Sequence, residues 1–277
     1  MNPTLFTRRA SLKPRRLAWV VSAWAIFACM GASPSENFVV PDSVSKELAA
    51  AKLPEHELRL RLKILENVAT GKTYFPHPAR GLPETRNSKY WKPGDEGYVP
   101  IGSATEAIRD LWRTQNGIQC YKYSTLIMIK AMIDLADKSR ISELDELLGG
   151  KVIPNDLPQD GIGTLFTELE PKNGKFFSVS ELIPGDQVYF KNPYYSRLTA
   201  GMMQAKPGGY LGQQGYEVFY FGDGKVIPIY GGKAQSIATF REGLRQWTSV
   251  KDVAAKERRD PQAEDFQITC VRRAIAH

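Results

Sequence analysis

Two stretches specify the predicted sheet: PGDQVYFKNP at residues 184–193 and YEVFYFGDGKVIPIY at residues 216–230. Pro184, Gly185 and Asp186 have turn composition, and the β-prone run 187–191 follows them. In the second stretch, the segment Gly222-Asp223-Gly224 separates two β-prone runs, as in a hairpin with a tight turn. The sequence therefore predicts an antiparallel sheet that contains the strand 187–191 and the hairpin 216–230.

The chain on either side of these strands is mainly helical. Apolar periodicity predicts helices at 42–70, 103–112, 120–138, 143–148 and 236–248. Pro54 interrupts the first helix, and Ser103 or Thr105 is expected to cap the second. The helix from Cys120 is so apolar that we expect it to be buried against the sheet. Because most helices precede the strands, the sequence predicts the α+β class.

The N-terminus is typical of an export signal. Residues 1–16 include five basic residues and no acidic residue. The run 17–28 is apolar, and small residues follow it. The apolar run is shorter than the roughly 20 residues of a spanning helix, although an uncleaved anchor is an alternative. The run Ile26-Phe27-Ala28-Cys29 resembles a lipoprotein cleavage box, in which Cys29 would be acylated and tether the protein to a membrane. We expect an exported protein that is periplasmic, extracellular or lipid-anchored.

Composition divides the chain into four segments. We expect a signal peptide at 1–32, a linker with a helical extension at 33–86, a main domain at 87–250 and a charged C-terminal tail at 251–277. The whole chain has a formal net charge of +7. Residues 1–32 contain five basic residues and no acidic residue, so the chain without them has a net charge of +2. So small a charge gives no reason to expect nucleic acid as a partner.

Two cysteines, Cys120 and Cys270, remain after the signal. In an exported protein they could form a disulfide, or one could be a reactive thiol and the other a bystander. Cys120 lies at the expected start of a helix, where unpaired N–H groups and the helix dipole favour an anion. A thiol in that place has a lowered pKa and is a better nucleophile, which is typical of cysteine acyl-transfer enzymes. The alternative is a buried cysteine that packs on the sheet.

Several motifs are shared, in order, with one family of enzymes. They are Asn87-Ser88-Lys89-Tyr90-Trp91, Ala107-Ile108-Arg109-Asp110, Cys120 with its helix to Ala131-Met132-Ile133-Asp134, the run 185–193, and Gly222 with Lys225. From about Asn87 to Trp247 the chain resembles the spore-coat transglutaminases of bacilli. The resemblance implies a papain-like α+β fold, with the helix of the nucleophile packed on an antiparallel sheet.

The same resemblance implies a reaction and its partners. A cysteine, here Cys120, would attack a protein glutamine side chain, release ammonia and form a thioester. A lysine amine would then accept the acyl group and form an isopeptide bond. The reaction needs no calcium, so no metal or other cofactor is expected. The partners would be protein substrates, one a glutamine donor and the other a lysine acceptor.

The chain departs from this family at three site positions. Gln119 stands where the family has a glutamate, and it could instead donate a hydrogen bond to the oxyanion. Tyr216 takes the place of a second glutamate, with Glu217 one step further along the strand. Ile229 is near the place of the family histidine. Neighbouring strand residues face opposite sides, so Tyr216 and Glu217 are alternative candidates for the partner of Cys120. These departures indicate weakened or lost activity.

Two other functions fit the same pattern. Cell-wall cysteine peptidases of the NlpC type also place a cysteine at a helix start, before a Pro-Gly-Asp strand and a hairpin like 216–225. Their histidine would be at Tyr216. The third function is a non-catalytic binding protein on the same scaffold, in which Cys120 is a relic.

Overall fold

The computed structural model describes residues 38–70, 89–94, 97–113, 120–149, 165–197, 215–229 and 232–275. The predicted export signal at 1–32, with Cys29, lies outside these residues. Within the described ranges, no helix has both the length and the apolar content to cross a lipid bilayer.

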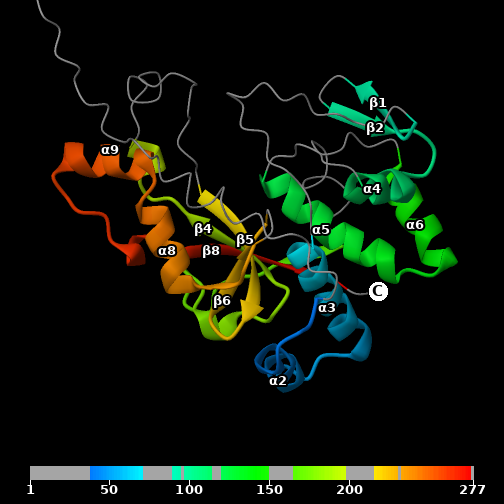
Figure 1. Cartoon of the computed structure of the whole chain (residues 1–277), viewed down its shortest axis with the longest axis horizontal. Coiled ribbons are helices and arrows are strands. Elements are labelled where there is room, and N and C mark those ends of the chain that lie inside the picture. Colours follow the sequence, from blue (N-terminus) through cyan, green and yellow to red (C-terminus); the bar gives the residue numbers. More distant parts are fainter. Residues whose placement is uncertain are drawn as a thin grey trace, which may run out of the picture. The chain divides into compact units, whose positions relative to one another are not determined.

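Helices occupy most of the described chain before residue 150. They are α2 (Asp42–Ala50), α3 (Glu55–Thr70), α4 (Ala104–Arg113), α5 (Cys120–Leu135) and α6 (Lys138–Leu148) (Figure 1). The predicted interruption at Pro54 separates α2 from α3. The predicted cap of α4 is also present, since the Ser103 hydroxyl accepts a hydrogen bond from the Glu106 backbone N–H at 3.1 Å. A small hairpin, β1 (Trp91–Gly94) with β2 (Gly97–Pro100), precedes α4.

The rest of the described chain contributes an antiparallel sheet and two helices. The strands are β3 (Phe166–Glu168), β4 (Gln187–Lys191), β5 (Gly215–Gly222), β6 (Lys225–Pro228), β7 (Gln235–Ser236) and β8 (Ile268–Ala274), and the helices are α8 (Ile237–Arg245) and α9 (Thr248–Glu257). Short 3-10 turns cover Val179–Glu181, Tyr195–Arg197 and Ala263–Asp265. Among the described residues the strand order is β3-β8-β4-β5-β6-β7, and every neighbouring pair is antiparallel. The expected α+β class is therefore correct.

The predicted hairpin forms β5 and β6. Gly222 pairs with Lys225, so the loop consists of Asp223 and Gly224. Both loop residues have positive φ angles, 54° and 63°, as a type I′ turn requires. This turn chemistry, visible in the sequence, fixes the register of the two strands.

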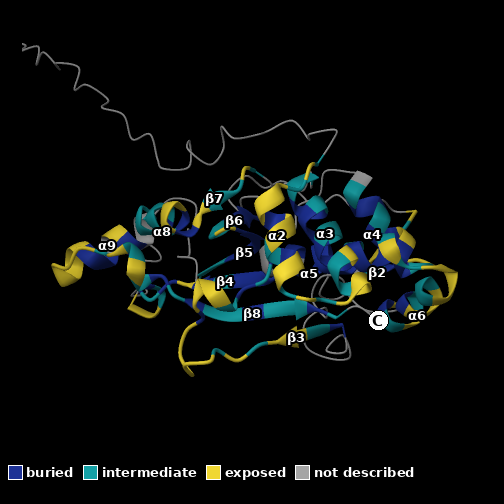
Figure 2. Ribbon diagram, turned by 90° about the horizontal axis from the view of Figure 1, so that it is seen from below, coloured by how far each residue is buried: buried dark blue, intermediate teal, exposed yellow. Residues whose placement is uncertain are grey.

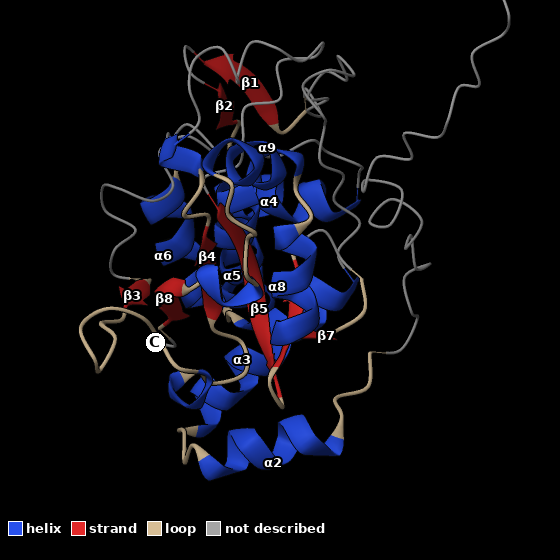
Figure 3. Cartoon of the chain, turned by 90° about the vertical axis from the view of Figure 1, so that its left-hand side faces the viewer, coloured by secondary structure: helices blue, strands red, loops and turns tan. Residues whose placement is uncertain are grey.

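The sheet separates two apolar cores. On one face, Phe219 of β5 and Ile227 of β6 pack with α3 and α5. On the other face, Val218 and Tyr220 of β5 pack with α8 and α9. Figure 3 shows β4 and β5 flanked by helices, and Figure 2 shows buried residues concentrated on β5 and on the helices around it. The predicted packing of the Cys120 helix on this sheet is confirmed, because α5 lies against β5.

The C-terminal segment differs from the expected charged tail. Residues 268–274 form β8, which lies inside the sheet between β3 and β4. Ile268, Val271 and Ala274 are buried, and α9 before it also buries Val250 and Val253. The strand was not predicted because Arg272 and Arg273 made the segment look like an exposed, charged tail. In the fold, Arg272 pairs with Glu168 and Arg273 pairs with Asp186.

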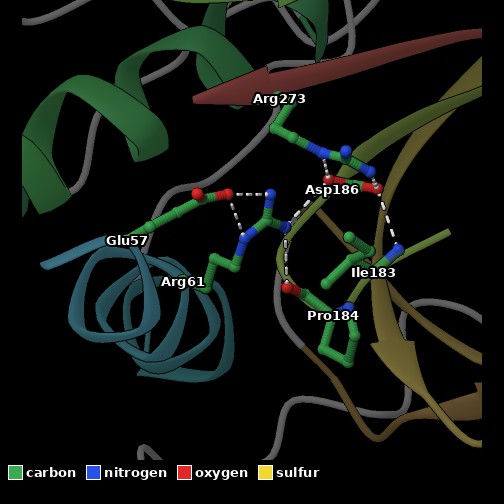
Figure 4. A network of polar contacts seen from close by, with 6 residues as sticks. All are labelled: Glu57, Arg61, Ile183, Pro184, Asp186 and Arg273. Atoms are coloured by element: carbon green, nitrogen blue, oxygen red, sulfur yellow. Dashed lines mark hydrogen bonds and ion pairs between the residues drawn. The ribbon is translucent and has the colours of Figure 1, made fainter. Parts of the chain in front are cut away.

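A buried ionic network joins α3 to the start of β4 and the end of β8. The Asp186 carboxylate, fully buried, accepts hydrogen bonds from Arg61 at 2.9 Å and from Arg273 at 2.9 and 2.7 Å (Figure 4). The Ile183 backbone N–H also donates to it at 2.9 Å. Gly185 lets α3 approach this closely, because a Cβ at that position would lie 3.1–3.3 Å from Arg61 atoms. The predicted turn before β4 thus anchors α3.

Candidate functional site

Cys120 is the first residue of α5, as the sequence predicted. The placement of its side chain is outside what the structure describes, and so is the whole of Gln119. Ser124 follows Cys120 by four residues, which puts the two positions on one face of the helix, a single turn apart. The surroundings of Ser124 therefore locate the part of the sheet that lies nearest to the start of α5.

Glu217 is the sheet residue that meets this turn of α5. The Ser124 hydroxyl donates a hydrogen bond to Glu217 Oε2. Gln187 of β4 donates its amide Nε2 to the same hydroxyl at 2.7 Å. All three side chains are buried, with Glu217 only 8% exposed. The structure thus brings one of the two predicted partner candidates, Glu217, to the helix that begins at Cys120.

Tyr216 has different surroundings, because its neighbour Glu217 takes the position that faces α5. Its ring packs on Phe240 of α8 and on Trp247, with ring centroids 5.6 and 6.0 Å apart. The remaining predicted position, Ile229, is buried among apolar residues. Of the histidines, His56 is exposed on α3, and His77 and His277 lie outside the described residues.

Burial and neighbouring donors act in opposite directions on Glu217. Burial is the largest effect and raises the pKa of the carboxyl above 4.5, while the Ser124 hydroxyl, the Arg272 charge and the Gln187 amide oppose it. A carboxyl with a raised pKa can exchange a proton closer to neutral pH, as general acid–base catalysis requires. The arrangement can therefore serve as a proton acceptor and donor beside the start of α5.

Cys270 lies in the same cross-strand row as Glu217. Tyr189 of β4 pairs with both residues, with Glu217 on one side and Cys270 of β8 on the other. Cys270 carries a free thiol, whose pKa is raised to about 12, chiefly by burial and then by the nearby Glu168 carboxylate. Such a thiol is protonated at neutral pH, so Cys270 has the character of the bystander in the pair of cysteines.

Tyr189 extends this row toward the head of β5. A Cβ at Gly215 would lie 2.3–2.4 Å from the Tyr189 ring and hydroxyl, so the ring crosses the backbone of Gly215. Only glycine allows this close approach.

We did not predict Ser124, Gln187 or Tyr189 as site residues from the sequence. For Ser124 a signal existed, since it is a polar residue one turn after Cys120 in an apolar helix.

The raised pKa of Glu217 leads to a prediction about stability. An unfolded glutamate ionises near pH 4.5 while the buried carboxyl stays protonated to a higher pH, so the folded state binds more protons over that interval. The Glu217 contribution is thus fully present below pH 4.5 and is lost as the pH rises through the folded pKa. Glu217→Gln should therefore gain stability relative to the wild type as the pH increases from 4.5 toward neutrality.

Urea unfolding of both proteins at a series of pH values measures this difference. The exposed replacement Glu143→Gln is the control and should change the free energy of unfolding by less than about 1 kcal/mol. A constant difference between Glu217→Gln and the wild type across the range would contradict the raised pKa.

Within the described ranges, no group of three or more His, Cys, Asp or Glu side chains is placed to hold a metal ion. The chain matches no family model, and no curated protein matches its sequence. A solved structure, that of a transglutaminase from Geobacillus stearothermophilus without its C-terminal extension, is similar to it. The TM-score is 0.52 at 18% identity, and the match covers 80% of this chain and 95% of that one. The chain therefore has a transglutaminase-like fold.

Proposed function

We propose that the chain is an exported enzyme of the spore-coat transglutaminase type, built on a papain-like core. It would move an acyl group from a protein glutamine to a lysine amine through a thioester on Cys120. The observation that carries the proposal is the buried Glu217 carboxyl, which faces α5 one turn after Cys120 in a transglutaminase-like fold. The contact of Glu217 with α5 and the packing of Tyr216 on α8 support Glu217 as the proposed partner of the thiol.

In the first half-reaction, the Cys120 sulfur forms a bond to the side-chain carbonyl carbon of glutamine. Glu217 takes the thiol proton and then delivers it to the departing nitrogen, so that ammonia leaves and a thioester remains. In the second half-reaction, a lysine amine attacks the thioester. The carboxylate takes a proton from the amine, the isopeptide bond forms, and the thiol is regenerated with its proton. Gln119, the residue before Cys120, would donate a hydrogen bond to the oxyanion.

The isoleucine at position 229, near the place of the family histidine, lowers the expected rate of acyl transfer. A family histidine would supply a second proton carrier, and an isoleucine cannot. The pair of Cys120 and Glu217 must then carry all the proton transfers, which predicts turnover slower than that of the spore-coat enzymes. The substrates would be proteins outside the membrane, at the periplasmic, extracellular or lipid-anchored location that the N-terminus predicts.

The test compares two neighbouring residues of β5. The mature protein should couple a labelled primary amine into a glutamine-rich protein. Glu217→Gln should slow this coupling about 10²- to 10⁴-fold, the usual contribution of an acid–base group. Tyr216→Phe, which keeps the ring that packs on Phe240 and Trp247, should leave the rate close to that of the wild type.

Other outcomes would contradict the proposal in distinct ways. Cleavage of cell-wall peptides without amine coupling would indicate the NlpC-type peptidase. A larger loss from Tyr216→Phe than from Glu217→Gln would assign the partner role to Tyr216. Neither coupling nor cleavage by the wild type would indicate the binding protein.

A further inference from the structure

Three buried polar side chains from three elements meet beneath the start of α5. Ser124 of α5, Gln187 of β4 and Glu217 of β5 are 0%, 3% and 8% exposed. The serine hydroxyl lies at the centre, with the carboxylate as its acceptor and the Gln187 amide as its donor. The other amide atom of Gln187, Oε1, is buried with no hydrogen-bond partner within the described part of the chain.

This arrangement can satisfy Glu217 in either protonation state. When Glu217 is ionised, Gln187 donates to the serine oxygen and the serine donates to the carboxylate. When Glu217 is protonated, its O–H can donate to the serine oxygen, and the serine can donate to the Gln187 oxygen after the amide turns over. A hydroxyl both donates and accepts, and an amide carries a donor at one end and an acceptor at the other. The three side chains can therefore stay hydrogen-bonded to one another while the carboxyl gains or loses a proton in the core.

Few charged groups act on the carboxyl within the part of the chain that the structure describes. Arg272 of β8 favours the ionised form, and the same residue is 3.7 Å from the Glu168 carboxylate. Tyr189 and Cys270 are the titratable groups in the cross-strand row. Arg61 of α3 donates a hydrogen bond to Asp186. Within the described residues, Ser124 hydrogen-bonds the carboxyl, Gln187 hydrogen-bonds Ser124, and Arg272 acts on the carboxyl by its charge.

We propose that Ser124 and Gln187 are positioning residues, which hold the Glu217 carboxyl toward Cys120 and let it change protonation state during acyl transfer. This inference rests on the acyl-transfer function proposed above. The spore-coat resemblance assigns no role to either residue; their contacts in the fold do. Removing the hydroxyl would leave the carboxyl and the amide facing a gap in the core.

The experiment compares Ser124→Ala with Ser124→Thr, which keeps a hydroxyl at the same position. The first measurement follows the infrared C=O stretch of protonated carboxyls against pH, and the Glu217 band is identified by its absence in Glu217→Gln. Because the serine hydroxyl favours the ionised form, Ser124→Ala should move the Glu217 midpoint to higher pH, and Ser124→Thr should restore it. Gln187→Leu should move the midpoint in the same direction.

The second measurement is the steady-state rate of amine coupling. Ser124→Ala should lower kcat about 10- to 100-fold with little change in KM, because a mispositioned group slows the chemistry rather than the binding. Ser124→Thr should again recover most of the rate. A purely structural hydrogen bond would leave kcat and the pH–rate profile unchanged in any variant that remains folded by circular dichroism, even where the infrared midpoint moves.

The two proposals fail in different ways. An unmoved midpoint in folded Ser124→Ala, or a midpoint that moves while kcat stays at the wild-type value, overturns the positioning role and leaves the acyl transfer intact. If the wild type couples no amine, the acyl transfer fails. The positioning role then fails with it unless the pH dependence of Cys120 alkylation by iodoacetamide shifts together with the infrared midpoint in Ser124→Ala.

Discussion

Asp186→Ala is expected to lower the free energy of unfolding by about 3–5 kcal/mol, the range seen when one partner of a buried ion pair is removed. The substitution leaves the buried guanidinium of Arg61 facing Arg273 without the carboxylate between them. It also removes the acceptor of the Ile183 backbone N–H. Since the network joins α3 to β4 and β8, the loss of stability should appear as a single unfolding transition at a lower urea concentration.

The measurement is urea denaturation followed by circular dichroism, with an exposed ion pair as the control. Arg140 and Glu143 form such a pair on α6 at 2.5 Å, and Glu143→Ala should cost less than about 1 kcal/mol. If Asp186→Ala destabilises the protein no more than Glu143→Ala does, the network does not hold α3 on the sheet.

Cys120→Ala is expected to reduce amine coupling to the level of a reaction without enzyme, and Cys270→Ala is expected to retain it. The two cysteines form a matched pair, because each loses one sulfur in the same substitution. Cys120 begins α5, where the helix N-terminus stabilises a thiolate. Cys270 lies in β8 with a pKa raised to about 12, so it supplies almost no thiolate at neutral pH.

Incorporation of a labelled amine into a glutamine-rich protein, quantified on denaturing gels, measures both variants. Circular dichroism of each variant shows whether it has folded. Coupling that survives Cys120→Ala but disappears in Cys270→Ala would reverse the assignment of nucleophile and bystander. Loss in both variants with the fold intact would indicate that the two thiols act together.

Local chemistry made the central part of the fold predictable. The turn residues before Gln187 and between Gly222 and Lys225 mark the ends of β4, β5 and β6, and these strands formed close to the predicted limits. The start of α5 at Cys120 was also predicted from sequence. In each case the residues that decide the structure are adjacent in the chain, so pattern alone carries the information.

Contacts between distant residues were not predictable in the same way. β8 is held by pairing with β3 and β4, and its arginines have acceptors at Glu168 and Asp186 far earlier in the chain. The choice between Tyr216 and Glu217 also depended on which face of β5 meets α5. The contact of Ser124 with Glu217 spans 93 positions, and that with Gln187 spans 63. Only the assembled sheet fixes such pairs.

Mass spectrometry of the acyl-enzyme shows whether Cys120 carries out the proposed acyl transfer. The mature protein is mixed with a short glutamine-containing peptide, without amine, and is quenched in acid after brief incubation. We expect a covalent adduct on the Cys120 peptide whose mass is that of the whole substrate peptide less ammonia, together with release of free ammonia. Excess primary amine should remove the adduct. An adduct that carries only a fragment of the substrate peptide, or no adduct on Cys120 in folded protein, would contradict the acyl-transfer function.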